Sequence, residues 1–223
     1  MKLINSLMKF EIVTEEGYFN SLIIENRDFF RSAIQDIYSQ INGREGNFVL
    51  SENNKIIDFS KNAELITQFV PFESNSKKLI TKLYSSIKSS VTEPDIYMKI
   101  AEIKSNIFRY MDSIANEFDF NVKYNEDFDI TVLLKMVDLK FESEYETLSE
   151  NVLEYILNSE GLEGSKLHIL VNFRSYVNKD ELECFCTTLV KHNISLLLID
   201  NFEYEKFDCE KRVIVDEHFC EIY

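Results

Sequence analysis

The sequence predicts an α/β protein in which a mainly parallel sheet is interrupted by an inserted α-helical segment. Two near-continuous apolar segments, 168–173 and 194–199, flank a helical segment, which is the pattern of parallel strands buried on both faces. Only five Gly and two Pro occur among 223 residues, so we expect long regular elements. Residues 72–138 repeat apolar residues at helical spacing. We therefore expect an α/β head formed by 1–71 and 139–223, and a helical leg formed by 72–138.

The first part of the head is predicted to contain a strand, a helix and two short strands. Tyr18–Ile24 is rich in residues that favour strands, and residues 28–38 place apolar side chains at helical spacing, with Asn26 as the N-cap. Turns at Asn42-Gly43 and Gly46-Asn47 separate this helix from the two strand candidates, which are Phe48–Ser51 and Lys55–Phe59.

The leg is predicted to be a helical hairpin. Its first arm carries one apolar stripe, and Thr92-Glu93-Pro94-Asp95 ends that arm and begins the next, with Thr92 as N-cap. The second arm has an apolar seam that needs a partner helix. The stripe consists of Leu79, Leu83, Ile87 and Val91, and the seam of Ile96, Ile100, Ile103, Ile107, Met111, Ile114 and Phe118.

After Phe118 an acidic segment runs to Asp129, and the chain then returns to the head. Asn178 with Glu181 three residues later forms a capping-box pattern that predicts the start of a helix. The helices expected in this part are Ile130–Val137, Ser149–Leu157 and Asn178–Lys191, and the strands are His168–Phe173, Ile194–Ile199, Arg212–Val215 and Phe219–Ile222.

The composition is that of a globular protein, with 45% hydrophobic and 28% charged residues. No apolar run approaches the roughly 18 residues of a transmembrane helix, and Met1–Lys9 is too short and polar for a signal peptide. We therefore expect a cytoplasmic protein, with no membrane partner, whose four cysteines are thiols.

The charge is unevenly distributed along the chain. The whole chain has a net charge of −15, but Ser76–Asp112 holds seven basic and four acidic residues and is the basic part. On a monomer these cations form only a solvated face, whereas a symmetric oligomer repeats them into a site for several phosphates. The basic residues are Lys77, Lys78, Lys82, Lys88, Lys99, Lys104 and Arg109.

Enzymatic chemistry has little support in the sequence. The head has the outline of a degenerate P-loop-like fold, but the connection Glu25–Asp28 has no glycine and no Lys-Ser/Thr pair, so it lacks a phosphate loop. Asp200 ends a predicted strand, as a metal-holding acid would, or as an ordinary strand-end acid. The three histidines lie near no nucleophile motif. A zinc site is disfavoured because no Cys-x-x-Cys occurs among Cys184, Cys186, Cys209 and Cys220.

The acidic segment 117–129 has two interpretations. It holds seven oxygen-bearing side chains within thirteen residues, the ligand type that Ca²⁺ prefers, but it is not an EF-hand because the glycine and the closing glutamate are absent. It is either a solvated acidic loop or a Ca²⁺ site, joined in the second case by carboxylates from Glu142, Glu144 or Glu146. Its side chains are those of Glu117, Asp119, Asn121, Asn125, Glu126, Asp127 and Asp129.

These residues resemble the Csn2 family, the small adaptation proteins of type II-A CRISPR systems. The similar stretches run from Asn116-Glu-Phe-Asp119 through Asp129-Ile-Thr-Val-Leu-Leu-Lys135, and along His168-Ile-Leu-Val-Asn-Phe-Arg-Ser-Tyr-Val-Asn-Lys-Asp-Glu181. The order Ser195–Asp200, Tyr204, Val213-Ile-Val-Asp216 and Phe219 extends the similarity to the C-terminus. The resemblance in sequence covers residues 110–223. Over residues 1–109 only the predicted order of helices and strands is similar.

The resemblance implies a non-enzymatic homotetrameric ring that encloses double-stranded DNA, favours free DNA ends, and needs Ca²⁺ for assembly and binding. Its role is spacer acquisition, alongside the CRISPR integrase pair and the effector nuclease. On this chain it makes the leg cations listed above candidates for the inner face of the ring. It also makes five carboxylates candidate Ca²⁺ ligands, namely Glu117, Asp119, Glu126, Asp127 and Asp129.

Two other functions stay open at the level of the sequence. One is a degenerate nucleotide-binding α/β enzyme with a site around Asp28 and Asp200. The other is an acidic adaptor whose helical seam, Ile96–Phe118, binds a protein partner.

Overall fold

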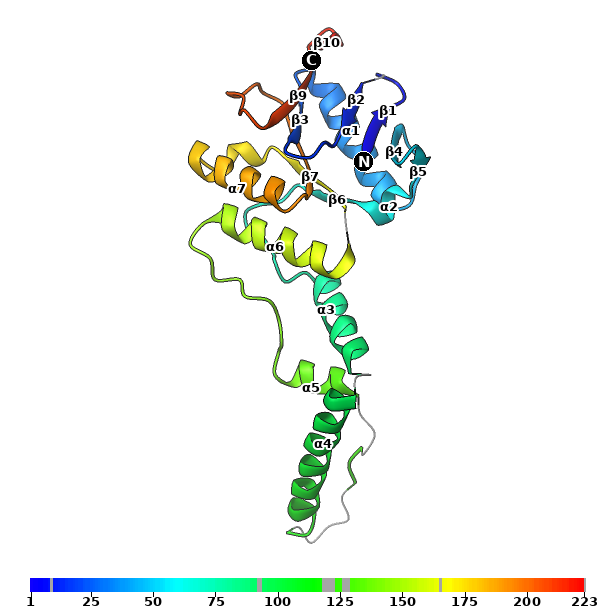
Figure 1. The fold of residues 1–223 in the computed structure, drawn as a ribbon, viewed down its shortest axis with the longest axis vertical. Helices are drawn as coiled ribbons and strands as arrows, with labels where there is room; N and C mark the ends of the chain where they lie inside the picture. Colours follow the sequence, from blue (N-terminus) through cyan, green and yellow to red (C-terminus); the bar gives the residue numbers. More distant parts are fainter. Residues whose placement is uncertain (9, 92–93, 118–122, 126–128, 165, 223) are drawn as a thin grey trace. The chain divides into compact units, whose positions relative to one another are not determined.

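The computed structural model describes residues 1–223 apart from 9, 92–93, 118–122, 126–128, 165 and 223. The chain divides into two compact units, one formed by Met1–Ser74 with Glu144–Tyr223 and the other by Asn75–Ser143 (Figure 1). We keep the names head and leg for these two units. The leg thus begins at Asn75 rather than at residue 72, and it ends at Ser143 rather than at residue 138.

A six-stranded sheet with the order β10-β9-β3-β8-β7-β6 forms the centre of the head. Its strand β3 (Phe19–Ile24) pairs in parallel with β9 (Glu210–Val215) and with β8 (Ser195–Asp200). The strands β7 (Leu167–Val171) and β6 (Ala63–Ile66) continue the parallel arrangement, and β10 (Glu221–Ile222) pairs antiparallel with β9. All residues of β3 and β7 are buried, because both faces of the sheet are covered. The predicted α/β fold with a mainly parallel sheet is confirmed.

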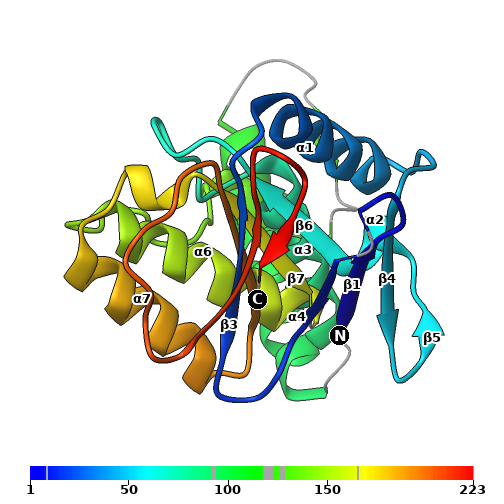
Figure 2. The same cartoon turned by 90° about the horizontal axis from the view of Figure 1, so that it is seen from above.

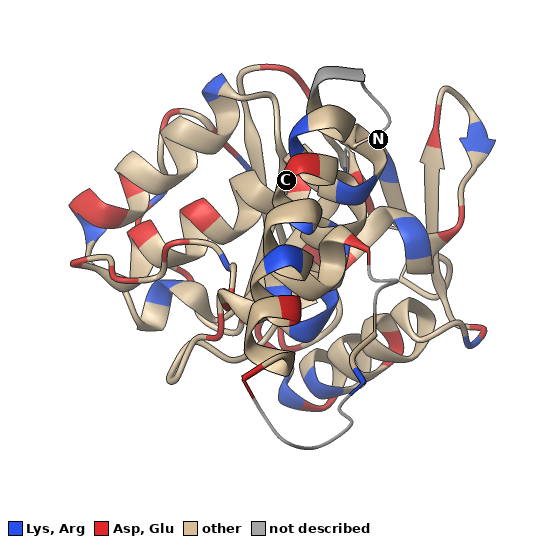
Figure 3. Ribbon diagram, turned by 90° about the horizontal axis from the view of Figure 1, so that it is seen from below, with Lys and Arg blue, Asp and Glu red and all other residues tan. Residues whose placement is uncertain are grey.

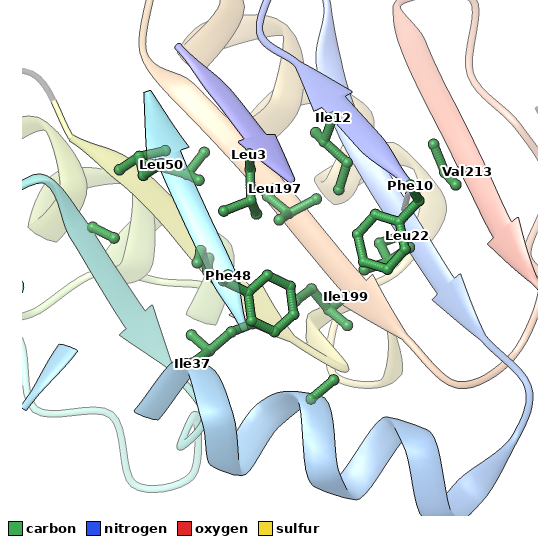
Figure 4. Packing of buried hydrophobic residues seen from close by; sticks show 14 of the residues in the cluster. Leu3, Phe10, Ile12, Leu22, Ile37, Phe48, Leu50, Leu197, Ile199 and Val213 are labelled. Carbon is green, nitrogen blue, oxygen red and sulfur yellow. The ribbon is translucent and has the colours of Figure 1, made fainter. Parts of the chain in front are cut away.

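One face of this sheet is covered by α1 (Arg27–Ile41) and by a second, antiparallel sheet of order β2-β1-β4-β5. Figure 4 shows side chains of the small sheet, including Leu3 and Leu50, packed with Leu22, Leu197 and Ile199 of the large one. The strands of the small sheet are β1 (Lys2–Asn5), β2 (Glu11–Val13), β4 (Phe48–Glu52) and β5 (Lys55–Ile56). This cluster forms half of the hydrophobic core.

The opposite face is covered by α6 (Leu148–Glu163) and α7 (Lys179–Lys191), which lie side by side (Figure 2). Ile156 of α6 and Phe185 of α7 are fully buried in this second cluster. Each helix begins with a capping box, formed by Thr147 and Glu150 in α6 and by Asn178 with the residue three positions on in α7. The capping-box start predicted for α7 is therefore confirmed, and α6 extends beyond the predicted end at Leu157.

The sequence indicated β4 and β5 of the small sheet, but not β1, β2 or the outer strand β6. The strands β1, β2 and β6 have three or four residues each, too few to establish an alternating pattern. The predicted strand Lys55–Phe59 is also wrong beyond Ile56. Phe59 instead begins the short helix α2 (Phe59–Asn62), because the Asp58 side chain caps it by accepting a hydrogen bond from the Ser60 N–H.

The leg contains α3 (Lys77–Ser90), α4 (Pro94–Ala115) and α5 (Ile130–Met136). The predicted hairpin of two packed helices is wrong. Helix α3 packs against α5, and the Tyr84 hydroxyl donates to the carbonyl of Leu139 at 3.0 Å. Helix α4 extends away from the end of α3 instead of folding back along it (Figure 1). Thr92 and Phe118, the predicted cap and the last seam residue, lie outside the described residues.

Candidate nucleic-acid interface

Four of the predicted DNA-binding residues lie on α3. The Ser76 side chain begins this helix by accepting a hydrogen bond from the Leu79 N–H. Because successive residues turn by about 100°, two of the four lysines point in one direction and two in another. Lys78 and Lys82 form one pair, Lys77 and Lys88 form the other, and all four side chains are exposed. The helix therefore presents two pairs of cations rather than a single row.

The other three predicted residues lie on α4 and point in three different directions. Lys99, Lys104 and Arg109 are each five residues apart, which separates them by about 140° around the helix. Lys99 and Lys104 flank the apolar seam on its two sides, and Arg109 lies on the far side of the helix. Lys104 is half-buried, whereas the other two are exposed. One α4 helix therefore cannot direct all three cations at one DNA duplex.

Lys88 and Asp129 pair with each other. The Lys88 Nζ lies 2.6 Å from Asp129 Oδ2, and Asp129 also caps α5 by accepting a hydrogen bond from the Thr131 N–H. The hydrogen bond from Lys88 holds the pKa of Asp129 below its usual value. A predicted DNA-binding cation and a predicted Ca²⁺ ligand thus neutralise each other within the leg.

The described part of segment 117–129 does not by itself form a Ca²⁺ site. Asp119, Glu126 and Asp127 lie outside the described residues, so their predicted role as ligands is not tested. Of the remaining candidates, Glu117 follows the end of α4 and Asp129 is engaged with Lys88. Among the described residues no group of three or more His, Cys, Asp or Glu side chains is arranged to hold a metal ion. This result covers the four cysteines and three histidines, all of which are described.

The start of α1, where a phosphate loop would lie, is occupied by side chains of the chain itself. Asn26 Oδ1 accepts a hydrogen bond from the Phe29 N–H at 2.9 Å, and Asp28 places a carboxylate in the first turn, paired with Arg31 at 3.0 Å. Phosphate binding at a helix start needs exposed N–H groups and no competing negative charge. The local geometry does not favour nucleotide binding there.

Asp200, the other residue of the nucleotide alternative, belongs to a buried network of charged residues. Arg174 Nε lies 3.1 Å from Asp200 Oδ2, and Arg174 Nη2 lies 2.9 Å from Glu210 Oε1. Glu210 also accepts hydrogen bonds from Ser21 and from Arg212. Burial raises the pKa of Asp200 to about 6, although the Arg174 charge opposes this shift. Asp200 is therefore an internal ion-pair partner rather than an exposed strand-end acid.

A second buried network surrounds His168, whose side chain is fully buried. Its Nδ1 lies 3.2 Å from Glu64 Oε2 and its Nε2 lies 2.8 Å from Glu160 Oε1. Sequence analysis assigned no role to Arg174, Glu64 or Glu160. The sequence places Arg174 directly after an apolar strand, which suggests a buried charge. It does not show that the partners of this charge are Asp200 and Glu210.

The charges of the two units differ strongly. The head sequence contains 14 Lys and Arg against 28 Asp and Glu, whereas the leg contains 10 against 11. Figure 3 shows Lys and Arg interspersed with Asp and Glu along the ribbon. The leg is therefore the part of the chain that repels a polyanion least.

Comparison with known proteins identifies the family. Residues 40–219 match the family model described as CRISPR-associated protein (Cas_Csn2). A CRISPR-associated protein Csn2 from Streptococcus agalactiae is 20% identical over 205 residues, covering 89% of this chain and 91% of that protein. The crystal structure of Stu0660 of Streptococcus thermophilus is similar in fold, with a TM-score of 0.62 and 14% identity. The match covers 100% of this chain and 76% of the Stu0660 chain.

The family match extends over most of the chain and includes both units, so it does not depend on one shared domain. Among the described helices, none has the length and apolarity that crossing a membrane requires. The resemblance seen in the sequence is confirmed, and the chain belongs to the Csn2 family of CRISPR-associated proteins, which supports a role in CRISPR adaptation.

Proposed function

We propose that this protein is a non-enzymatic, cytoplasmic component of CRISPR spacer acquisition that binds the ends of double-stranded DNA as a homotetrameric ring. Binding is independent of sequence and requires Ca²⁺, and the protein acts alongside the integrase pair and the effector nuclease. The observation that carries the proposal is the difference in charge between the two units: the head has twice as many acidic as basic residues, whereas the leg is nearly balanced.

The acidic head directs DNA toward the leg. Contacts to phosphates supply most of the affinity in binding without sequence preference, and these contacts come from Lys and Arg. The leg offers exposed lysines on α3, with Lys78 and Lys82 one helical turn apart on the same side. Two lysines contact only two phosphates, so a single leg binds DNA weakly.

Assembly of several legs around one duplex overcomes this weakness. Lys99, Lys104 and Arg109 point in different directions on α4, so in a symmetric ring different cations of neighbouring copies face the same duplex. The seam of α4 provides a surface for association, because Ile96, Ile100 and Ile107 remain half-buried within the chain. A closed ring also explains a preference for free ends, since a ring is threaded onto DNA at an end.

Ca²⁺ enters the proposal through the carboxylates of segment 117–129. Binding of a divalent cation there neutralises negative charge in the leg and reduces repulsion of the phosphates. The ligands among Glu117, Asp119, Glu126, Asp127 and Asp129 are a prediction that the calcium and chelator arms of the experiment below address as a set.

Replacing Lys78 and Lys82 with Gln is expected to weaken DNA binding about tenfold or more and to make binding less dependent on salt, because fewer counterions are released. The measurement is a gel-shift titration with linear duplex over a series of salt concentrations. The matched control replaces Lys55 and Lys191 with Gln, which removes the same charge from exposed positions of the head and should leave the affinity nearly unchanged. Equal losses in the two variants would assign the effect to net charge rather than to a leg interface.

The proposal as a whole is tested by comparing linear and closed-circular duplex, each with Ca²⁺ or with chelator. We expect the wild-type protein to bind linear DNA in Ca²⁺ and to bind poorly in the other three conditions. Equal binding to linear and circular DNA contradicts threading of a ring. Strong binding in chelator removes Ca²⁺ from the proposal, and absence of binding in all four conditions rejects the DNA function.

A further inference from the structure

The chain leaves the head for the leg, and later returns to the head, through two neighbouring elements of the head. We call these two segments the exit and the return. The exit is the segment 67–74, which directly follows β6, the outer strand of the six-stranded sheet. The return begins at Glu144 and leads into α6. The leg is covalently connected to the head through these two segments, so contacts between β6 and α6 hold the two attachments of the leg together.

His168 connects these two elements from inside the head. It lies on β7, beside Glu64 of β6 in the sheet register, and its ring reaches Glu160 of α6 on the other side. The two ring nitrogens therefore face carboxylates from β6 and α6, at 3.2 Å and 2.8 Å. A single buried side chain thus bridges the strand before the exit and the helix after the return.

The surroundings of the ring favour its charged form, because each nitrogen lies near a carboxylate oxygen. A carboxylate only accepts hydrogen bonds, and a neutral imidazole carries one N–H, so it would leave one nitrogen lone pair facing a carboxylate. The imidazolium carries an N–H on both nitrogens, so Nε2 hydrogen-bonds to Glu160 and Nδ1 forms an ion pair with Glu64. Burial alone would lower the pKa of His168, but hydrogen bonds to Glu160 and Glu64 outweigh burial and raise it above the ordinary value of 6.5.

Tyr155 of α6 extends the same set of contacts to the exit segment. Its hydroxyl donates to Glu64 Oε1 at 2.6 Å, and its ring makes an edge-to-face contact with Phe72 at 5.5 Å between centroids. Ser159 adds a longer hydrogen bond to Glu64 Oε2 at 3.4 Å. Although burial opposes it, the hydrogen bonds from His168 and Tyr155 lower the pKa of Glu64 to about 2. An open pocket of about 310 Å³ is lined by Glu64, Tyr155 and the exit segment.

We propose that the buried His168 imidazolium is a latch that binds α6 to β6 and so fixes, within the head, both segments through which the leg is attached. Loss of its proton leaves Glu64 and Glu160 facing one N–H and releases α6 and the exit segment before the rest of the head unfolds. The other charged groups nearby are Lys166 and Glu163, which pair with each other beside the network, whereas the neighbouring strand β8 contributes the apolar Leu196.

The pH range follows from the two pKa shifts. A group whose pKa is raised on folding contributes its full stabilisation below the unfolded pKa, so the His168 contribution is complete below 6.5 and is lost as the pH rises through the raised value. The Glu64 contribution is complete above 4.5 and is lost as the pH falls toward about 2. The latch is therefore strongest between pH 4.5 and 6.5, and raising the pH above this range weakens it.

Hydrogen–deuterium exchange of the full chain tests the latch. We expect His168→Gln to raise exchange about tenfold in peptides covering 63–74 and 144–163 at pH 6.5, with α1 unchanged. In the wild type the same two regions should lose protection as the pH rises above 6.5, after correction for the intrinsic exchange rate. The matched control is His192→Gln, at an exposed histidine just after α7.

A general increase of exchange over α1 as well would show a structural core residue rather than a latch, and unchanged exchange would overturn the proposal. If His168→Gln does not fold, nitrogen NMR of the wild-type imidazole ring decides: two protonated nitrogens at pH 6 support the latch, and one contradicts it. None of these measurements involves DNA, so their outcome is independent of the proposed function.

Discussion

Replacing Arg174 with Met is expected to lower the free energy of unfolding by roughly 3–5 kcal/mol, the cost of breaking a buried ion pair by removing one partner. The Arg174 side chain is 1% exposed and lies between Asp200 and Glu210, which have 1% and 0% exposed side chains. Arg212 still pairs with Glu210 in the variant. Asp200 loses the cation that its buried carboxylate faces.

The loss should depend on pH in a direction fixed by Asp200. Its pKa is raised to about 6 in the folded state, so the folded protein binds more protons than the unfolded chain between 3.8 and 6, and stability falls as the pH rises through that range. The Arg174 charge lowers the pKa of Asp200, so removing that charge raises this pKa further. The decrease in stability then extends to higher pH. Urea unfolding of wild type and Arg174→Met at pH 5 and pH 8 should therefore show the larger difference at pH 8.

Two variants make this result specific. Arg44→Met removes an exposed arginine of the head and should change stability by less than about 0.5 kcal/mol. Adding Asp200→Asn to Arg174→Met removes the stranded carboxylate and should recover part of the loss. If the double variant is no more stable than Arg174→Met at pH 8, the aliphatic contacts of Arg174, rather than its charge, stabilise the head.

The parts of the fold that the sequence predicted are those with long, local signals. The strands β7 and β8 are continuous apolar segments, and α7 begins with a capping box that involves residues three positions apart. The outer strand β6 has neither signal: its four residues include Glu64, which is tolerated in a half-buried strand because His168 lies beside it in the register. Such a pairing joins residues about a hundred positions apart, so local sequence patterns do not predict it.

In the leg, the sequence predicted a helix correctly but not the element that packs against it. The seven-residue periodicity of α4 correctly gives a helix with one apolar side, but periodicity does not say which element covers that side. The sequence suggested α3, whereas α3 packs against α5. The ion pair between Lys88 and Asp129 could likewise not be predicted from the sequence, because the two residues are separated along the chain by the whole of α4.

Replacing Ile107 with Asp on α4 is expected to abolish self-assembly and to reduce DNA affinity about a hundredfold, the size of effect that loss of multivalent binding produces. Ile107 lies at the middle of the seam, which is half-buried or exposed in the described chain, with Ile103 46% exposed. If other copies cover this seam, the substitution places an unpaired carboxylate in an apolar contact. Ile107 is only half-buried in the folded monomer, so the helix content of the variant should change little.

The chain offers a matched control on the same helix. Met98 is nine residues before Ile107, about 180° around α4, and is 70% exposed, so Met98→Asp adds the same charge on the opposite side. Light scattering over a range of protein concentrations, with Ca²⁺ and with chelator, should show a tetramer for wild type and Met98→Asp in Ca²⁺, and a monomer for Ile107→Asp. A wild-type monomer in Ca²⁺ would favour the adaptor, in which the seam binds another protein. A tetramer that survives Ile107→Asp would place the copy-to-copy contact elsewhere, and the leg cations would then have to be brought together by another surface.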